Sequence, residues 1–147
     1  MEAGEYAMEW FKEKIIVETR GKGMYPITQQ LTPMIQSWNI QEGICHLFIA
    51  HTSASLVINE SYDPSARQDM EVFMEKLAPE GESWYRHTLE GRDDSTSHLR
   101  AILTATSLSI PIDDGDLTLG TWQGVYLFEH RVRSHHRSVL VRCLKVS

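Results

Sequence analysis

The chain has 147 residues, of which 41% are hydrophobic and 23% are charged, so its composition is that of an ordinary globular protein. The formal net charge of -6 offers no broad basic surface for nucleic acid. No apolar run reaches the roughly 18 residues that a membrane-spanning helix needs, and the N-terminus does not read as a signal peptide. We therefore expect a single cytoplasmic domain over residues 10–147, preceded by a flexible tail at 1–9, with no nucleic-acid or membrane partner.

Only two cysteines occur, Cys45 and Cys143, and each lies inside an apolar run. Two buried free thiols are favoured over a disulfide, because a buried cysteine packs as a small apolar side chain. This cysteine usage agrees with a cytoplasmic location, where thiols stay reduced.

The first half of the domain alternates strand and helix patterns. Aromatic and β-branched residues predict a strand over 10–19, and GICHLFIAH predicts another over 43–51. Between them, apolar residues at helical spacing predict a helix over 27–38 that begins near Pro33 or bends there. The next segment, HTSASLVINE at 51–60, has the apolar centre of a buried strand and polar residues at both ends. We expect those polar ends to serve one site.

The clearest helix covers residues 63–79. Asp63 is an N-cap candidate, Pro64 fits the first helical position, and Pro79 marks the end. Apolar residues recur at three- and four-residue steps, which predicts one apolar face. That face comprises Ala66, Met70, Phe73, Met74 and Leu77.

The second half begins with a shorter helix, predicted over 96–105 with a cap residue from 93–95. Three strands are then expected over residues 107–112, 121–132 and 138–146. The composition of DDGD at 113–116 is typical of a turn. Strands at both ends with helices between them indicate an α+β domain with a mixed or antiparallel sheet.

Titratable side chains gather in the connecting segment at 84–99, WYRHTLEGRDDSTSHL. Loops held by a rigid scaffold commonly carry binding groups. The imidazoles of His51, His87 and His98, with nearby carboxylates, can ligate Zn or a similar metal. His98 in the first turn of a helix can also contact a phosphate or give it a proton. The alternative for His51 is an ordinary histidine with satisfied hydrogen bonds at a strand end.

The acids of the same segment allow a second interpretation. Glu90, Asp93 and Asp94 can hold Mg²⁺, which prefers oxygen ligands and often shares them with substrate phosphates. Asp93 or Asp94 can equally be a plain helix N-cap. None of these spacings is a strong metal motif, so the choice between Mg and Zn stays open.

Glycines flank a bulky triplet in LGTWQGVYLFEHR. A glycine inside a strand pattern often marks a bulge or the close approach of a ligand. Trp122 can stack on an aromatic ring of a ligand while Gln123 hydrogen-bonds it, or Trp122 can pack in a core or a subunit interface.

A basic run, RVRSHHR, covers residues 131–137 between two predicted strands. As a hairpin turn it is simply solvated. As a phosphate clamp it would act through Arg131 or Arg137, because the guanidinium fork matches phosphate oxygens. Glu129 and Arg131 share one strand face and can pair with a neighbour.

The order and spacing of these segments resemble the YjbQ-like family, also called the secondary thiamine-phosphate synthase family. The resemblance runs from about Trp10 to the C-terminus and rests on HTSASLVINE, the DP that starts the following helix, YRHTLEGRDD, SHLRA, SLSIPI and LGTWQGVYLFEHR. It implies an α+β fold with a sandwich-like β core, a homotrimer, and a polar site near a subunit boundary. The residues carried over to that site are His51, Asn59, Glu60, Asp63, His87, Glu90, Asp94, His98, Trp122, Gln123, Glu129 and Arg131. Many relatives have glycines where this chain has Ser134, His135 and His136.

The resemblance implies a thiamine-phosphate synthase activity, possessed as a primary or a secondary function. The reaction joins an aminopyrimidine methyl diphosphate to a thiazole phosphate, and Mg²⁺ on Asp93, Asp94 or Glu90 would neutralise the leaving diphosphate. The expected catalytic residues are His51, His87, Asp94 and His98. The expected substrate-binding residues are Asn59, Glu60, Trp122, Gln123 and Arg131.

Two alternatives accompany this hypothesis. The first is a metal-dependent hydrolase of a small phosphorylated metabolite, in which Zn activates water. Its candidate ligands are His51, His87, Glu90, Asp93, Asp94 and His98. The second is a non-catalytic trimer that binds a metal or a phosphorylated ligand.

Overall fold

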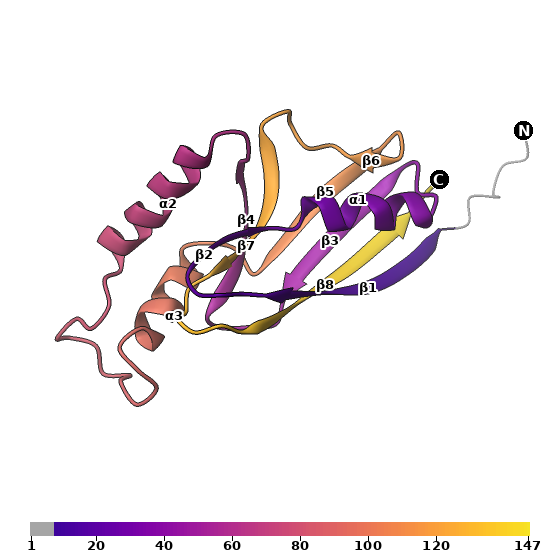
Figure 1. Cartoon of the computed structure of the whole chain (residues 1–147). Helices are drawn as coiled ribbons and strands as arrows, with labels where there is room; N and C mark the ends of the chain where they lie inside the picture. Colours follow the sequence, from indigo (N-terminus) through magenta and orange to yellow (C-terminus); the bar gives the residue numbers. More distant parts are fainter. Residues whose placement is uncertain (1–7) are drawn as a thin grey trace, which may run out of the picture.

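The computed structural model describes residues 8–147, which form two antiparallel sheets and three helices (Figure 1). Residues 1–7 of the predicted tail lie outside the described residues, and Glu9 already begins β1. The strands are β1 (Glu9–Glu18), β2 (Gly23–Pro26), β3 (Gly43–Ile49), β4 (Ala54–Glu60), β5 (Ser107–Asp113), β6 (Asp116–Leu117), β7 (Gln123–Glu129) and β8 (His136–Lys145). The helices are α1 (Thr28–Ser37), α2 (Pro64–Leu77) and α3 (Asp94–Ile102). The predicted α+β class with an antiparallel β core is confirmed.

The larger sheet has the strand order β1-β8-β3-β5-β6, and the smaller has the order β2-β7-β4. Their facing side chains and α1 form the main core. Because successive side chains of a strand point to opposite faces, every second residue contributes to it. Buried members from the five-stranded sheet are Ile15, Val17, Cys45, Leu47, Ile49, Ile110, Ile112, Leu117, Val139, Val141 and Cys143. Those from the rest of the chain are Ile27, Leu31, Ile35, Ile40, Ala54, Leu56, Val125 and Leu127.

Strand β7 is buried on both faces, which explains its continuous apolar run. Val125 and Leu127 point into the main core, whereas Tyr126 and Phe128 join a smaller cluster with Met74 of α2. A strand covered on both faces carries apolar residues without alternation. Strand β7 is therefore the central rigid element, and its C-terminal end leads directly into the candidate site.

Helix α2 begins as predicted, since the Asp63 side chain accepts a hydrogen bond from Ser65 N at 2.9 Å and Pro64 is the first helical residue. Its predicted apolar face is only partly buried. Met74 is buried, but Phe73 is 61% exposed and Leu77 is 52% exposed. The physical reason is that α2 projects away from the main core and covers only the small cluster on the smaller sheet (Figure 1).

Other boundaries also differ from expectation. Helix α1 continues through Pro33, the predicted strand at 121–132 shortens to β7, and β2 and β6 were not anticipated. The predicted turn at 113–116 is present, with Asp114 and Gly115 at positive φ. Among residues 8–147, no helix has the length and apolar character that crossing a bilayer requires.

The cysteines are both free and buried, as predicted. Cys45 and Cys143 are direct partners in the β3–β8 register, so the two thiols contact each other inside the main core. The hydrogen bond with the Cys143 thiol, followed by burial, raises the pKa of Cys45 far above its ordinary range, which keeps it protonated and unreactive.

Candidate metal site and adjoining hollows

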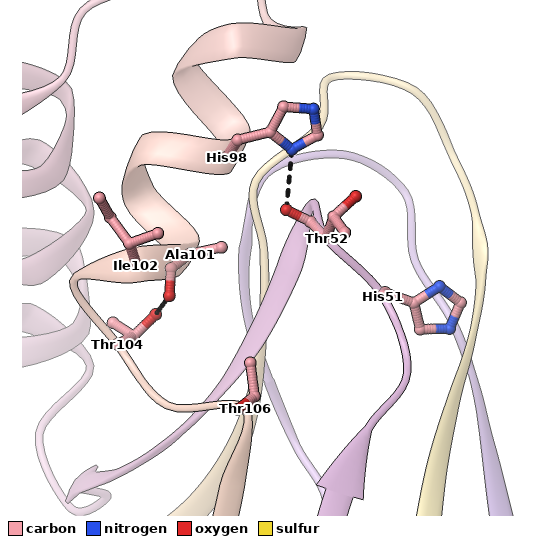
Figure 2. A pocket seen from close by; sticks show the side chains of 7 residues that line it. All are labelled: His51, Thr52, His98, Ala101, Ile102, Thr104 and Thr106. Carbon is pink, nitrogen blue, oxygen red and sulfur yellow. Dashed lines mark hydrogen bonds between the residues drawn. The ribbon is translucent and has the colours of Figure 1, made fainter.

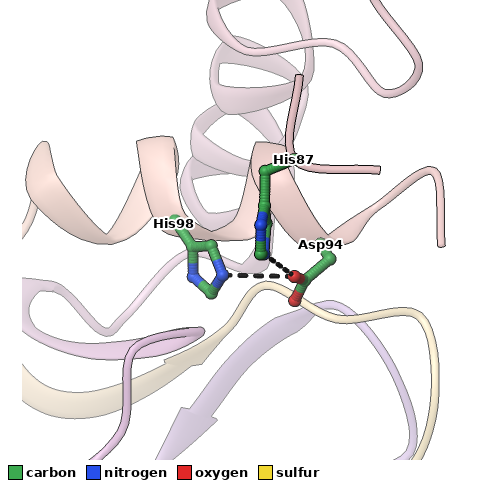
Figure 3. A group of neighbouring side chains, drawn as sticks. All are labelled: His87, Asp94 and His98. Carbon is green, nitrogen blue, oxygen red and sulfur yellow. Dashed lines mark hydrogen bonds and ion pairs between the residues drawn. The ribbon is translucent and has the colours of Figure 1, made fainter. Parts of the chain in front are cut away.

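The start of α3 brings together two imidazoles and one carboxylate. Asp94 and His98 lie one turn apart on the same face of the helix, and His87 reaches them from the preceding loop (Figure 3). Asp94 Oδ2 lies 2.6 Å from His87 Nε2 and 3.3 Å from His98 Nε2. The Asp94 side chain is 3% exposed, while those of His87 and His98 are 57% and 36% exposed. The carboxylate is thus fixed in the protein and the imidazoles are open to solvent.

Arg131 fixes the carboxylates of Asp93 and Asp94 by hydrogen bonds. Its Nη1 donates to Asp94 Oδ1 at 2.6 Å, and its Nε donates to Asp93 Oδ2 at 3.0 Å. Its Nη2 donates to the backbone carbonyl of Glu90 at 3.0 Å, while the Glu90 side chain is exposed. Asp93 therefore does not cap α3 with its side chain, and instead accepts from Arg131 and from Val132 N. Burial raises the pKa of Asp93, but these hydrogen bonds outweigh burial and hold the pKa below its usual range.

The orientation of His98 defines its tautomer. His98 Nδ1 lies 2.9 Å from the carbonyl oxygen of Thr52, which can only accept, so Nδ1 carries the proton. In the neutral ring Nε2 then presents a lone pair toward Asp94 Oδ2. Two lone pairs facing each other at 3.3 Å repel unless a proton or a cation lies between them. The site is thus arranged to hold positive charge between these atoms.

One hollow adjoins this cluster at His98, and a second hollow lies beside the first. The first has a volume of about 640 Å³ and is lined by His51, Thr52, His98, Ala101, Ile102, Thr104 and Thr106 (Figure 2). The second has a volume of about 500 Å³ and is lined by Phe48, Ile49, Ala50, His51, Thr52, Ser53, Thr106 and Arg137. Three lining residues, His51, Thr52 and Thr106, are common to both. A ligand in the first hollow would therefore meet His98 on one side and His51 on the other.

The structure does not bring His51 into the cluster with His87 and His98. His51 Nε2 accepts a hydrogen bond from Ser138 N at 2.9 Å, so its lone pair is already used. Burial, followed by the positive charge of Arg137, lowers the pKa of His51 and keeps the ring neutral. The expected third imidazole ligand is therefore a neutral histidine bound to β8.

Glu129 and Arg137 form a buried ion pair behind the second hollow. Arg137 Nε donates to Glu129 Oε1 at 2.8 Å, and Thr19 Oγ1 donates to the same oxygen at 2.6 Å. Burial raises the pKa of Glu129, but the hydrogen bonds from Arg137 and Thr19 outweigh burial and hold the pKa below its usual value. Glu129 thus pairs with Arg137, while Arg131 pairs with Asp93 and Asp94.

His130 was not anticipated as a special residue. It is fully buried, its Nε2 lies 2.8 Å from Ser55 Oγ, and Ser55 Oγ accepts from Thr104, which lines the first hollow. Among the side chains of residues 8–147, His130 Nδ1 is the buried polar atom that lacks a hydrogen-bond partner. Burial, with a smaller contribution from the charge of Arg100, lowers the pKa of His130 to about 3. His130 follows the last residue of β7, and its only sequence signal was a polar side chain directly after a long apolar run.

The remaining predicted residues lie elsewhere in the chain. Asn59 and Glu60 end β4, and Glu60 pairs with Gln123 at the start of β7. Trp122 packs edge-on against Tyr62 with ring centroids 4.9 Å apart. Since a strand rises about 3.3 Å per residue, the length of β4 places these residues roughly 20 Å from its His51 end. Within one chain, the two ends of HTSASLVINE therefore do not share a site.

Comparison with known proteins adds a family to this geometry. Residues 13–146 match the family described as UPF0047 protein YjbQ-like. The chain belongs to this UPF0047 family. A UPF0047 protein of Synechocystis sp. is 44% identical over 130 residues, which cover 88% of each chain. The UPF0047 protein YjbQ of Salmonella typhimurium is 37% identical over 132 residues, covering 89% of this chain and 95% of that protein.

Solved structures of the UPF0047 fold agree with the architecture. A YbjQ-like protein of unknown function from Sulfolobus solfataricus superposes with a TM-score of 0.86 at 27% identity, covering 95% of this chain and 99% of that chain. A conserved hypothetical protein from Thermus thermophilus gives a TM-score of 0.79 at 32% identity, with coverage of 88% and 97%. None of these names states an activity, so the function of this UPF0047 chain has to come from its site.

Proposed function

We propose that this UPF0047 chain is a metal-dependent hydrolase of a small phosphorylated metabolite, with His87, Asp94 and His98 as the metal ligands. The observation that carries the proposal is the convergence of two imidazole nitrogens and one carboxylate oxygen, all within 4.8 Å of one another, beside a hollow of about 640 Å³. A site with three protein ligands and an open position is typical of catalytic zinc.

The spacing of Asp94 and His98 supports a metal. Tetrahedral coordination at about 2.05 Å separates two ligand atoms by roughly 3.3 Å. The distance from Asp94 Oδ2 to His98 Nε2 is already 3.3 Å, and His87, which is on an exposed loop, has to withdraw from 2.6 Å. The outer contacts are also those of metal ligands, because His98 donates its other ring N–H to a backbone carbonyl and Asp94 is held by Arg131.

The donor set favours Zn²⁺ or a similar transition metal over Mg²⁺. Mg²⁺ prefers oxygen ligands, yet Asp93 and one oxygen of Asp94 are already paired with Arg131. Imidazole nitrogen suits Zn²⁺ and its neighbours. When bound, such an ion supplies Lewis acidity toward water or a phosphoryl oxygen.

The chain's own residues would position the substrate. His98 belongs to the ligand cluster and also lines the first hollow, so a substrate held in the hollow lies next to one of the proposed ligands. Ala101 and Ile102 give that hollow an apolar wall, which suits the organic part of a small metabolite. Thr104 and Thr106 also line that hollow, although the Thr104 hydroxyl is already hydrogen-bonded to Ser55.

The test is phosphate release from p-nitrophenyl phosphate and from a panel of small phosphate esters, with zinc-loaded and chelator-treated protein. We expect turnover that requires the metal and falls at least about a hundredfold in His87→Ala and in His98→Ala, equivalent to about 2.7 kcal/mol of transition-state stabilisation. The matched control is His46→Ala, because His46 lies on β3 and contacts Ser109 instead of the cluster. Turnover that is indifferent to both site variants would refute the assignment.

A transferase is the second candidate, and one observation favours it. The two hollows share His51, Thr52 and Thr106, so two substrates can meet there, as the joining of an aminopyrimidine methyl diphosphate to a thiazole phosphate requires. Thiamine phosphate formation with and without Mg²⁺ separates the candidates. Product that depends on Mg²⁺ and on His98 would favour transfer over hydrolysis.

We also propose that the chain assembles into the homotrimer expected from the family resemblance. Large apolar side chains are exposed on the outer face of the five-stranded sheet and on α2, among them Trp10, Ile44, Phe48 and Phe73. Such exposed apolar surface often marks an interface. Light scattering of the purified protein measures the assembly, and a monomer at all concentrations would exclude it.

A further inference from the structure

Two side chains at the corner where the two hollows meet, His51 and Arg137, have no part in the proposed metal site. His51 lines both hollows and Arg137 lines the second. Hydrogen bonds to other protein groups fix both side chains, so each presents one fixed edge to the hollow.

His51 can only donate a hydrogen bond into this corner. Its Nε2 accepts from Ser138 N at 2.9 Å, and a backbone N–H cannot accept in return. The proton of the neutral ring is therefore on Nδ1. In the described part of the chain Nδ1 has no hydrogen-bond partner. It is not fully buried, so solvent or a ligand can reach it.

Arg137 has one free edge as well. Its Nε and Nη2 bind Glu129, and Nη2 also donates to Ser53 Oγ at 2.9 Å. Nη1 makes no hydrogen bond within residues 8–147. Although the whole residue is only 4% exposed, Nη1 itself is not fully buried. A buried guanidinium with a single accessible edge is a rigid donor that loses little entropy when it binds a ligand.

The charges around this corner limit what it can bind. The charge of Arg137 is offset by Glu129, His51 is neutral, and His135 lies beside Glu129 with Nδ1 at 3.8 Å from Oε1. The corner therefore offers hydrogen-bond donors with little net charge. This suits a carboxylate or a singly protonated phosphate better than a fully ionised phosphate.

We propose that His51 Nδ1 and Arg137 Nη1 form a two-donor subsite for an oxyanionic group of the substrate, either a phosphate or a carboxylate. The inference rests on the proposed function, because a group anchored here places the rest of the substrate in the first hollow, toward His98. It assigns His51 to substrate binding and excludes it as a metal ligand or a general base, since its lone pair is bound to Ser138 N.

The test is a titration of metal-free protein, kept in chelator, with inorganic phosphate and separately with acetate, followed by NMR. We expect at least one of the two anions to bind, and its Kd to rise at least about tenfold in His51→Phe, which keeps a ring but removes the donor. Arg137→Lys, which keeps the charge opposite Glu129 and removes the outer N–H, is expected to act likewise. His46→Phe is the matched control and is expected to leave Kd unchanged.

The same titration separates this inference from the metal proposal. His87→Ala removes a metal ligand and is expected to bind the anion as the wild type does. If a variant fails to fold, the ring nitrogens of His51 in the wild type are read by long-range ¹H–¹⁵N correlation. A proton on Nδ1 that shifts when the anion is added supports the subsite. A proton on Nε2, no binding of either anion, or a Kd indifferent to His51→Phe would overturn it, whatever the metal does.

Discussion

Buried His130 is expected to make the protein sensitive to mild acid. Its pKa is lowered from 6.5 to about 3, first by burial and then by the nearby charge of Arg100. The unfolded chain therefore takes up a proton near pH 6.5 that the native state refuses until about pH 3. The free energy of unfolding therefore decreases as the pH falls from 6.5 to about 3. Between pH 7 and pH 5 this single group removes about 2 kcal/mol from the free energy of unfolding.

The assay is urea unfolding of the wild type and of His130→Gln at pH 7 and pH 5. Glutamine does not titrate, and its amide can still bond Ser55, so the variant isolates protonation from packing. We expect the loss of stability between the two pH values to be about 2 kcal/mol smaller in the variant. His136→Gln is the control, because the His136 side chain is 75% exposed. Equal losses in the wild type and in His130→Gln would refute the reasoning.

Three further substitutions test the fold, each by urea unfolding. Glu129→Gln leaves the buried charge of Arg137 uncompensated and is expected to lower the free energy of unfolding by about 3 to 5 kcal/mol. Adding Arg137→Met should recover part of that loss. A loss below about 1 kcal/mol in Glu129→Gln would contradict a buried pair. Asp63→Ala removes the N-cap of α2 and is expected to cost about 1 kcal/mol. Gly43→Ala places a Cβ against the backbone carbonyl oxygen of Leu144, so we expect a clear loss of stability, whereas an unchanged midpoint would show that β3 and β8 can separate.

The parts of the site that follow from local periodicity were predictable. A four-residue spacing on a helix places Asp94 and His98 on one face, and the density of titratable groups pointed to the loop that carries His87. The role of Arg131 was predicted only in part. The sequence marked it as a group that binds anions, but its partners, Asp93 and Asp94, lie 38 and 37 positions away in the chain.

Other expectations failed where a distant element decided the outcome. His51 appeared equivalent to His87 and His98, but its lone pair is taken by a backbone N–H of β8, 87 residues away. The grouping of His51 with Asn59 and Glu60 overlooked the length of an extended strand, which separates its two ends. The apolar face of α2 was read correctly as periodicity, but periodicity does not tell whether an element lies close enough to bury that face.

The most direct test of the central claim is the zinc affinity of the protein, measured by calorimetric titration of the wild type, His98→Ala and the control His46→Ala. If His87, Asp94 and His98 form a metal site, the wild type and His46→Ala bind one Zn²⁺ per chain, and His98→Ala binds at least about tenfold more weakly. Binding that is absent in the wild type, or equally tight in His98→Ala, would contradict a metal site at the start of α3.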